Sequence, residues 1–60
     1  MKVIDLLKVI CIDDEVSIYD YNTARRDYYT CPTKVDDKHL EKTVIYVGAN
    51  MEGTLAIYIK

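Results

Sequence analysis

The strand-like stretches of this chain alternate between aliphatic residues and tyrosines, and this alternation limits the folds open to it. All six aromatic residues are tyrosines, with no phenylalanine or tryptophan. In stretches 16–21 and 54–59, aliphatic side chains fall on one face and tyrosines on the other. Because a buried hydroxyl needs a hydrogen-bond partner, the tyrosine side is expected to be amphipathic. The pattern predicts a sheet with one dry face and one face that meets another molecule, most simply a second copy of the chain.

The length predicts one domain, residues 1–60, that needs support beyond its own core. A chain this short buries only about 60% of its unfolded surface. Disulfides, a metal or oligomerisation usually supply the missing stability. Cys11 and Cys31 have no metal-binding spacing and His39 is the only histidine, which excludes a structural zinc site. Oligomerisation remains, and a homodimer or tetramer is expected.

The charge and the apolar runs restrict location and partners. No apolar run reaches the roughly 18–20 residues of a membrane span, and the first residues do not form a signal peptide. The chain is therefore expected to be cytoplasmic, with reduced thiols. The net charge of −2 lacks the basic footprint of non-specific duplex binding. Any contact with DNA must therefore come from a local basic patch.

The pattern predicts one helix, two hairpins and a short helical turn. Residues 2–10 place apolar side chains at helical spacing, and Pro32 ends the second strand. A helical turn is expected at 36–41, with an aspartate as its N-cap and Leu40 as its anchor. The expected strands are 16–21, 26–31, 43–49 and 54–59, with turns at 22–25 and 50–53.

This order predicts an α+β domain, with a four-stranded antiparallel sheet and the N-terminal helix packed on one face. The C-terminal strand reads as an open edge, so the sheets of two protomers are expected to join there. The residues expected to dominate the core are Val3, Leu6, Leu7, Ile10, Val16, Ile18, Leu55, Ile57 and Ile59.

The acidic run from Asp13 to Glu15 is the strongest candidate for chemistry. Carboxylates bind Mg²⁺ or Mn²⁺ through oxygen, and a metal-bound water can attack a phosphodiester. The alternative is a solvated loop, because adjacent side chains on extended backbone diverge.

A second candidate lies at the first hairpin, where Arg25 and Arg26 precede Tyr28 and Tyr29. Bases that contact phosphates, next to rings that stack on nucleobases, are the components of a single-strand binding site. The alternative is a charged turn followed by ordinary strand tyrosines.

Two further polar residues have structural interpretations. Asp20 is in phase with Val16 and Ile18, and is expected to cap the hairpin rather than act as an acid. His39 has no partner visible in the sequence and is expected on the surface of the short helical turn. Nothing in the sequence supports acyl transfer or nucleotide hydrolysis.

Taken end to end, the chain resembles a group of small proteins encoded in prophages of gut Clostridia. Their plan is MKV-x-DLLKVI, an acidic turn, an E-V-x-I-Y-D strand, a short helix with a central leucine, a V-G-A segment and a closing T-L-x-I-x-I strand. The matching residues are 1–10, 13–20, 39–43 and 47–59. The group includes a type II-A anti-CRISPR protein whose fold is similar to single-stranded-DNA-binding coactivators of the positive-cofactor-four type. None of these motifs is a catalytic signature.

The resemblance implies a phage-derived anti-CRISPR protein that protects DNA from the type II CRISPR nuclease by nicking or relaxing supercoiled DNA. In that reading Asp14 binds the metal or activates water, Asp13 assists, and Arg25 and Arg26 hold phosphates. Mg²⁺ or Mn²⁺ would be the cofactor, and the cytoplasm of a bacterial host cell would be the location. The sequence leaves open whether the protein is an enzyme. The alternative is a non-enzymatic, homo-oligomeric interaction module that binds a host protein or single-stranded DNA.

Overall fold

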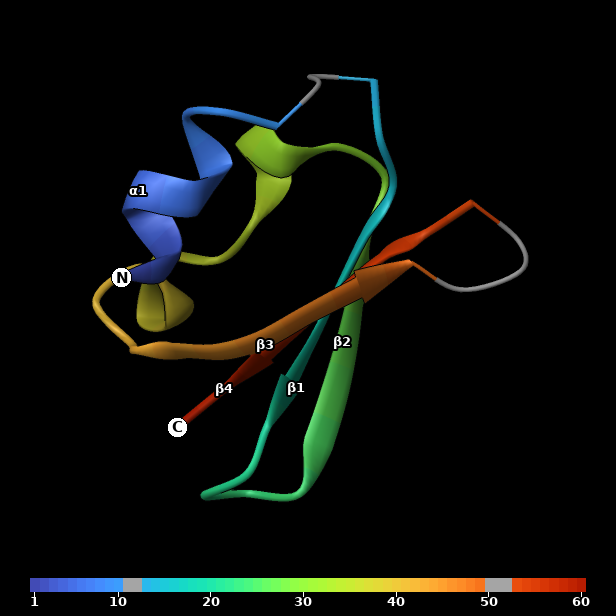
Figure 1. The fold of residues 1–60 in the computed structure, drawn as a ribbon. Helices are drawn as coiled ribbons and strands as arrows, with labels where there is room; N and C mark the ends of the chain where they lie inside the picture. The colour runs from blue at the N-terminus through green and yellow to red at the C-terminus, as the bar shows by residue number, and fades with distance from the viewer. Residues whose placement is uncertain (11–12, 50–52) are drawn as a thin grey trace.

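A four-stranded sheet forms one layer of the structure, and a short helix with two 3-10 turns forms the other (Figure 1). This computed structural model describes residues 1–10, 13–49 and 53–60. The elements are α1 Val3–Leu7, β1 Val16–Asp20, β2 Arg25–Tyr29, η1 Pro32–Lys34, η2 Asp37–His39, β3 Val44–Ala49 and β4 Leu55–Ile59. The predicted helix end near Cys11 lies outside the described residues, as does most of the predicted turn at 50–53.

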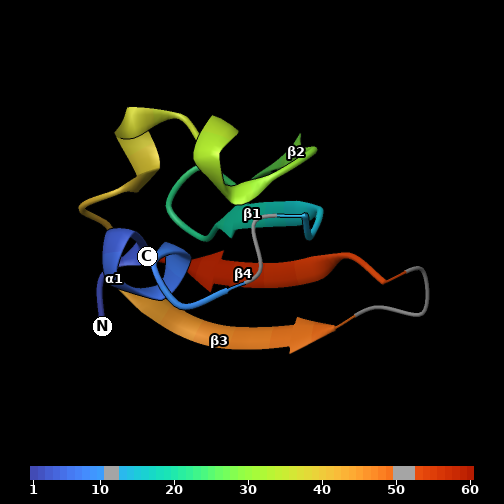
Figure 2. The ribbon, with the colours of Figure 1, turned by 90° about the horizontal axis from the view of Figure 1, so that it is seen from above.

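The sheet is mixed, so the prediction of a purely antiparallel sheet was wrong. The strand order is β2-β1-β4-β3, which Figure 2 shows from above. Both predicted hairpins are antiparallel, but they join through their inner strands, and β1 runs parallel to β4. Local sequence patterns set the pairing within a hairpin, whereas the relative direction of two hairpins depends on how the connection between them crosses the core.

The C-terminal strand is not an open edge, which corrects a second prediction. β4 lies inside the sheet and pairs with β1 on one side and β3 on the other. In the described part of the chain, β2 and β3 are the edges. Joining of protomers through β4 would require β4 to leave one of these neighbours.

The helix α1 has five residues, fewer than the predicted 2–10, and tertiary contacts hold it in place. The N–H groups of Val3 and Ile4 donate to the carbonyls of Lys42 and Leu40, both at 3.0 Å. The first N–H groups of a helix have no partner within the helix, and no side chain caps this one. A helix this short is unstable alone, so its backbone bonds to the segment before β3 fix it on the sheet.

The dry core lies between α1 and the sheet and largely matches the predicted set. Leu7, Ile10 and Leu55 are only partly buried. Val35, which the strand and helix patterns did not include, is buried beside them after η1. The buried cluster consists of Val3, Leu6, Val16, Ile18, Val35, Ile57 and Ile59.

The predicted short helical turn is present as η2, and Asp36 caps it as expected. The Asp36 carboxylate accepts a hydrogen bond from the N–H of Lys38 at 3.0 Å. Leu40 packs against the core as the predicted anchor. The turn lies on the same side of the sheet as α1, within the crossover from β2 to β3 (Figure 1).

Ala24, at the end of the β1–β2 turn, has a φ of 56°, in the left-handed region that disfavours a Cβ. Ala24→Gly is therefore expected to raise the free energy of unfolding by about 0.5–1 kcal/mol, after allowing for the greater entropy of the unfolded chain. Urea denaturation measures the change. Ala49→Gly, on exposed β3, is the matched control and is expected to lower stability by about 0.5–1 kcal/mol. A loss of stability in both variants would contradict the argument.

Candidate functional site

Five tyrosines and one arginine occupy the sheet surface that faces away from α1. Strand alternation places four of them opposite the buried residues of their own strands, as the sequence predicted for Tyr19 and Tyr58. Tyr46 reaches this face after a register shift in β3, and Tyr21 directly follows β1. We call this surface the tyrosine face. It consists of Tyr19, Tyr21, Tyr28, Tyr46, Tyr58 and Arg26. The sixth tyrosine, Tyr29, is in phase with the core face, pairs with Val16 and contacts His39.

Tyr58, on the central strand β4, connects the rings of the tyrosine face. Its ring centroid lies 5.9 Å from that of Tyr19, 6.1 Å from that of Tyr21 and 5.5 Å from that of Tyr46. Tyr19 and Tyr21 also meet edge to face at 5.1 Å. These distances are those of favourable aromatic pairs, so the rings form a continuous surface.

Arg26 lies across this aromatic surface. Its guanidinium carbon is 5.2 Å from the Tyr19 ring centroid and 5.3 Å from that of Tyr58. One guanidinium nitrogen donates to Ser17 Oγ at 3.0 Å and another to Tyr58 Oη at 3.4 Å. The bond to Tyr58 is the main reason that the pKa of Arg26 is raised above its ordinary value. Arg26 therefore remains a fixed cation on two half-buried rings.

The outer part of the tyrosine face is open to solvent. The exposed fractions are 55% for Tyr21, 71% for Tyr28 and 62% for Tyr46. Gly48 lies under the Tyr46 ring, since a Cβ at this position would come within 3.1 Å of a ring carbon. The missing side chain at Gly48 lets the Tyr46 ring lie down on the sheet.

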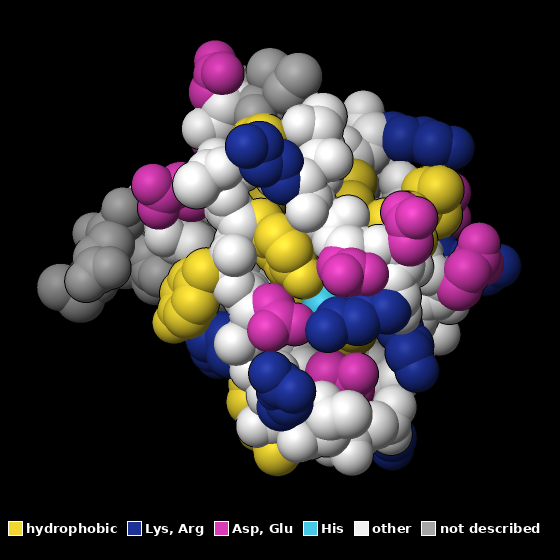
Figure 3. All heavy atoms as spheres, turned by 180° about the vertical axis from the view of Figure 1, so that it is seen from behind, with side chains coloured by type: hydrophobic (Ala, Val, Ile, Leu, Met, Phe, Trp, Pro, Cys, Tyr) yellow, Lys and Arg dark blue, Asp and Glu magenta, His cyan; other side chains and the backbone are white. Residues whose placement is uncertain are grey.

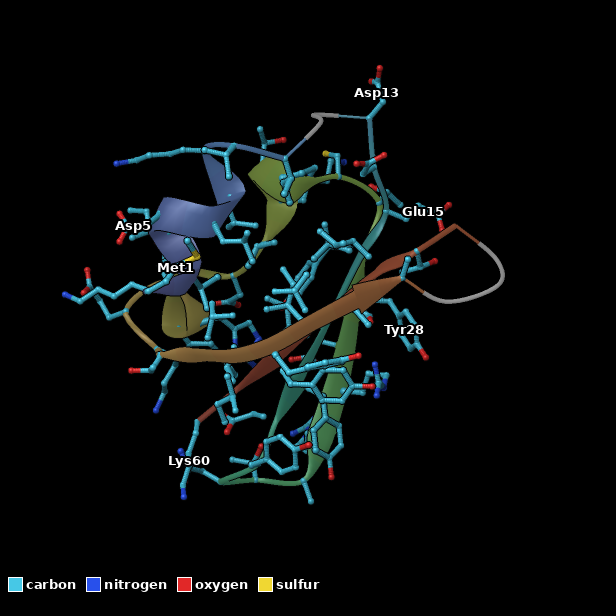
Figure 4. All side chains as sticks on the ribbon, viewed as in Figure 1. Met1, Asp5, Asp13, Glu15, Tyr28 and Lys60 are labelled. Carbon is cyan, nitrogen blue, oxygen red and sulfur yellow. The ribbon has the colours of Figure 1, made fainter. Side chains whose placement is uncertain are left out.

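The acidic turn is exposed at the end of the sheet where β1 begins (Figure 4). Asp13 and Asp14 have no hydrogen bond or ion pair with any described residue. Glu15 lies near Thr54, whose hydroxyl donates to the Glu15 carboxylate at 3.3 Å. No group of three or more metal-binding side chains occurs within residues 1–10, 13–49 and 53–60.

The structure does not bring the predicted catalytic and phosphate-binding residues together. Arg25 pairs with Asp20, six positions after Asp14, which corresponds to about 20 Å of extended chain. Arg25 and Arg26 also face opposite sides of the sheet, because they are neighbours on one strand. Only Arg26 belongs to the tyrosine face.

A pocket on the helix side of the sheet holds a group of charged side chains that the sequence pattern did not assemble. Its volume is about 280 Å³. It lies where the β1–β2 hairpin meets η2, and Figure 3 shows the single histidine recessed between basic and acidic side chains. The residues that line it are Asp20, Thr23, Arg25, Asp27, Lys38, His39 and Lys42.

His39 is buried in this pocket, so the prediction of a surface histidine was wrong. It is 4% exposed, and its Nε2 lies 3.0 Å from Asp27 Oδ2. Lys38 Nζ is 3.6 Å from the same oxygen. One signal in the sequence could have indicated the pair, because Asp27 is in phase with Tyr29 on the core face of β2. A carboxylate at such a position needs a polar partner.

Asp20 has the structural role that the sequence predicted. Asp20 is 7% exposed, and it lies opposite Arg25 in the register of the β1–β2 strand pair, at the end of the hairpin. Its carboxylate accepts a hydrogen bond from the N–H of Asn22 at 2.8 Å, and its carbonyl accepts one from the N–H of Ala24. These bonds close the β1–β2 turn.

The Asp27–His39 pair makes stability depend on pH in the acid range. The hydrogen bond from His39 is the main cause that holds the pKa of Asp27 below its ordinary value, and Lys38 adds to it. Because the folded pKa is the lower one, this stabilisation is present above about pH 4 and is lost as pH falls through the folded value. Asp27→Asn is expected to lower the free energy of unfolding at pH 7 by about 1.5–3 kcal/mol. It is also expected to reduce the loss of stability as the pH falls below about 4, which we call the acid limb of the stability curve.

Thermal denaturation followed by circular dichroism at a series of pH values measures this effect. Asp37→Asn, an exposed carboxylate of η2, is the control and is expected to keep the parental acid limb. Equal slopes in Asp27→Asn and the parent would show that the pair contributes nothing.

Of the two cysteines predicted to be reduced thiols, the structure describes Cys31. Cys31 is a free thiol whose pKa is lowered from its ordinary value, mainly by a hydrogen bond with the Thr33 hydroxyl at 3.1 Å. Cys11 lies outside the described residues.

Among the described residues, no helix has the length and hydropathy required to cross a bilayer. No family model matches the sequence, and neither curated proteins nor solved structures yield a match.

Proposed function

We propose that the protein binds single-stranded nucleic acid on the tyrosine face, without reading its sequence. The observation that carries the proposal is the position of Arg26 across Tyr19 and Tyr58, which lie side by side on the two central strands. Such surfaces bind single strands by stacking bases on rings while cations contact the phosphates.

The unused hydrogen-bonding capacity of Arg26 supports a phosphate contact. A guanidinium has five N–H donors, and two bonds of Arg26 are made within the chain, to Ser17 and Tyr58. The remaining donors are available to a phosphate. The exposed rings of Tyr28 and Tyr46 lie on either side of this position, on the two edge strands.

The distribution of charge supports the same surface. The net charge of −2 does not favour nucleic acid as a whole. However, no described strand residue of the tyrosine face carries a carboxylate, since Asp20 and Asp27 are in phase with the core face. The acids of the described strands therefore lie on the other side of the sheet from the rings.

Fluorescence anisotropy with a labelled oligothymidylate tests the proposal. The parent is expected to bind, and Arg26→Gln is expected to weaken binding by about tenfold and to reduce the salt dependence by roughly 0.7 in the log–log slope. Arg25→Gln removes the same charge from the opposite face of the sheet, and it is expected to weaken oligothymidylate binding less than Arg26→Gln does. Lys8→Gln, on the exposed end of the helix layer, is expected to bind like the parent.

The result that would overturn the proposal is the absence of saturable binding by the parent, or equal losses in Arg26→Gln and Lys8→Gln. The tyrosine face would then be better explained as a surface for a host protein or a second copy of the chain. A labelled duplex of the same length is expected to bind more weakly, because its bases are not free to stack.

The anti-CRISPR activity implied by the resemblance is a second proposal, and one observation favours it. The carboxylates of Asp13 and Asp14 have no structural partner in the described residues, which leaves their oxygens available to Mg²⁺ or Mn²⁺. Under this proposal, the parent converts supercoiled plasmid to the open-circular form with Mg²⁺, and an equally folded Asp14→Ala variant does not. Equal nicking by both proteins, or by neither, would remove the acidic turn as a catalytic site.

A further inference from the structure

The pocket on the helix side of the sheet contains more positive than negative charge. Arg25, Lys38 and Lys42 line it together with two carboxylates, Asp20 and Asp27. Its volume of about 280 Å³ is at the lower end of the range for small-ligand sites. A ligand here would be small and anionic.

Both carboxylates of the pocket already have partners within the chain. Asp20 accepts a hydrogen bond from the backbone of Asn22, at 2.8 Å. Asp27 accepts one from His39 and lies 3.6 Å from Lys38 Nζ. The charge of Lys38 compensates that of Asp27, and the hydrogen bond from Asn22 holds Asp20 in the β1–β2 turn. Neither carboxylate is therefore well placed to bind a metal.

Two cations of the pocket form no close polar contact with the described residues, although the charge of Arg25 helps to lower the pKa of Asp27. In the described part of the chain, Arg25 and Lys42 make no side-chain hydrogen bond or ion pair. Arginine presents a planar set of donors that matches the oxygens of a phosphate, and lysine adds a point charge. Together they supply the two charges that a phosphate dianion requires.

His39 supplies a further polar atom. The lowered pKa of Asp27 keeps that carboxylate ionised, so Nε2 of His39 carries the proton of their bond and donates it. Nδ1 has no hydrogen bond to a described residue, yet no buried side-chain nitrogen or oxygen there lacks a partner. Nδ1 is therefore reached by solvent. When the ring carries a proton on Nδ1, that nitrogen can donate a hydrogen bond to an oxygen of a bound anion.

We propose that this pocket binds a small phosphate-bearing anion between Arg25, Lys42 and His39. The anion would be inorganic phosphate or the terminal phosphate of a mononucleotide, which share the same recognition chemistry. The site is distinct from the tyrosine face, because Arg25 and Asp27 face the opposite side of β2 from Arg26 and Tyr28. The existence of this anion site therefore does not depend on whether the tyrosine face binds single-stranded nucleic acid.

Nuclear magnetic resonance titration of the full chain with inorganic phosphate, at constant ionic strength and pH, tests this inference. Saturable shifts are expected at the backbone amides of Arg25 and Lys42 and at the His39 ring. Arg25→Gln and Lys42→Gln are each expected to weaken binding by about tenfold or more. Both residues are on the surface, and preserved dispersion of the spectrum shows that each variant is folded. Lys8→Gln, remote from the pocket, is expected to titrate like the parent.

Adenosine monophosphate in place of phosphate distinguishes the two sources. Tighter binding of the nucleotide, with the same shifts in the pocket, identifies a mononucleotide, and equal or weaker binding identifies free phosphate. Linear shifts that never saturate, or equal weakening in Lys8→Gln and Arg25→Gln, would overturn the site. So would Mg²⁺ producing saturable shifts at Asp20 and Asp27 where phosphate produces none.

Discussion

Replacing both Tyr46 and Tyr58 by alanine is expected to weaken single-strand binding roughly thirtyfold or more. Each base stacked on an aromatic side chain contributes about 1–3 kcal/mol, and these two rings form one surface, with centroids 5.5 Å apart. Tyr58 also anchors Arg26 through its hydroxyl and its ring, so its loss would release the cation as well. Anisotropy with the labelled oligothymidylate measures the change.

Single substitutions at Tyr46 separate stacking from simple burial of apolar surface. Tyr46 is 62% exposed, so its replacement is expected to leave the fold intact. Tyr46→Phe keeps the ring and should bind nearly as well as the parent, whereas Tyr46→Leu keeps an apolar side chain without a π face and should bind like Tyr46→Ala. Parental affinity in Tyr46→Leu would contradict stacking and point to a protein partner.

Deleting residues 59–60 is expected to unfold most of the protein, rather than only separate protomers. Ile59 is fully buried, and its loss resembles a large-to-small core change of about 2–5 kcal/mol. The deletion also removes backbone bonds from Tyr21 to Ile59 and from Lys60 to Thr43, each contributing about 1 kcal/mol. A domain of this size is only marginally stable, so these losses remove most of its stability.

Far-ultraviolet circular dichroism and light scattering together measure the effect of this deletion. Removing Lys60 alone, an exposed residue, is the control and is expected to shift the melting temperature only slightly. A folded, dissociated protein after deletion of 59–60 would instead restore the idea that β4 joins protomers.

The hairpins and the two-faced sheet could be predicted because their causes are local. Alternation in 16–20 and 55–59 fixes which side chains point to the core, and the polar residues at 22–24 set the turn after β1. β2 ends at Tyr29, before the end at Cys31 that Pro32 indicated, and Pro32 begins η1 instead. The N-cap of η2 by Asp36 is equally local, since it spans two residues. The candidate rings at Tyr19 and Tyr58 followed from the same alternation. Tyr46 did not, because it reaches the tyrosine face only through the register shift between Val44 and Tyr46.

The direction of β4 could not be predicted in this way, and neither could the choice of His39 as the polar partner that Asp27 needs. The hydrogen bonds within each hairpin are the same whether the inner strands meet parallel or antiparallel, and the crossover through η1 and η2 decides between them. That crossover also brings residue 39 back over residue 27, a contact that no spacing in the sequence encodes.

The sequence by itself determined which side chains of β1 and β4 face the core, the turn between β1 and β2, and most of the core, because these depend on side-chain alternation and on residues close in the chain. The tertiary structure alone decided that the sheet is mixed, that the acidic turn lies far from Arg25 and Arg26, and that a buried histidine lies in a cationic pocket. Each of these depends on how distant segments pack, and packing is settled by the burial of the whole core rather than by any local pattern.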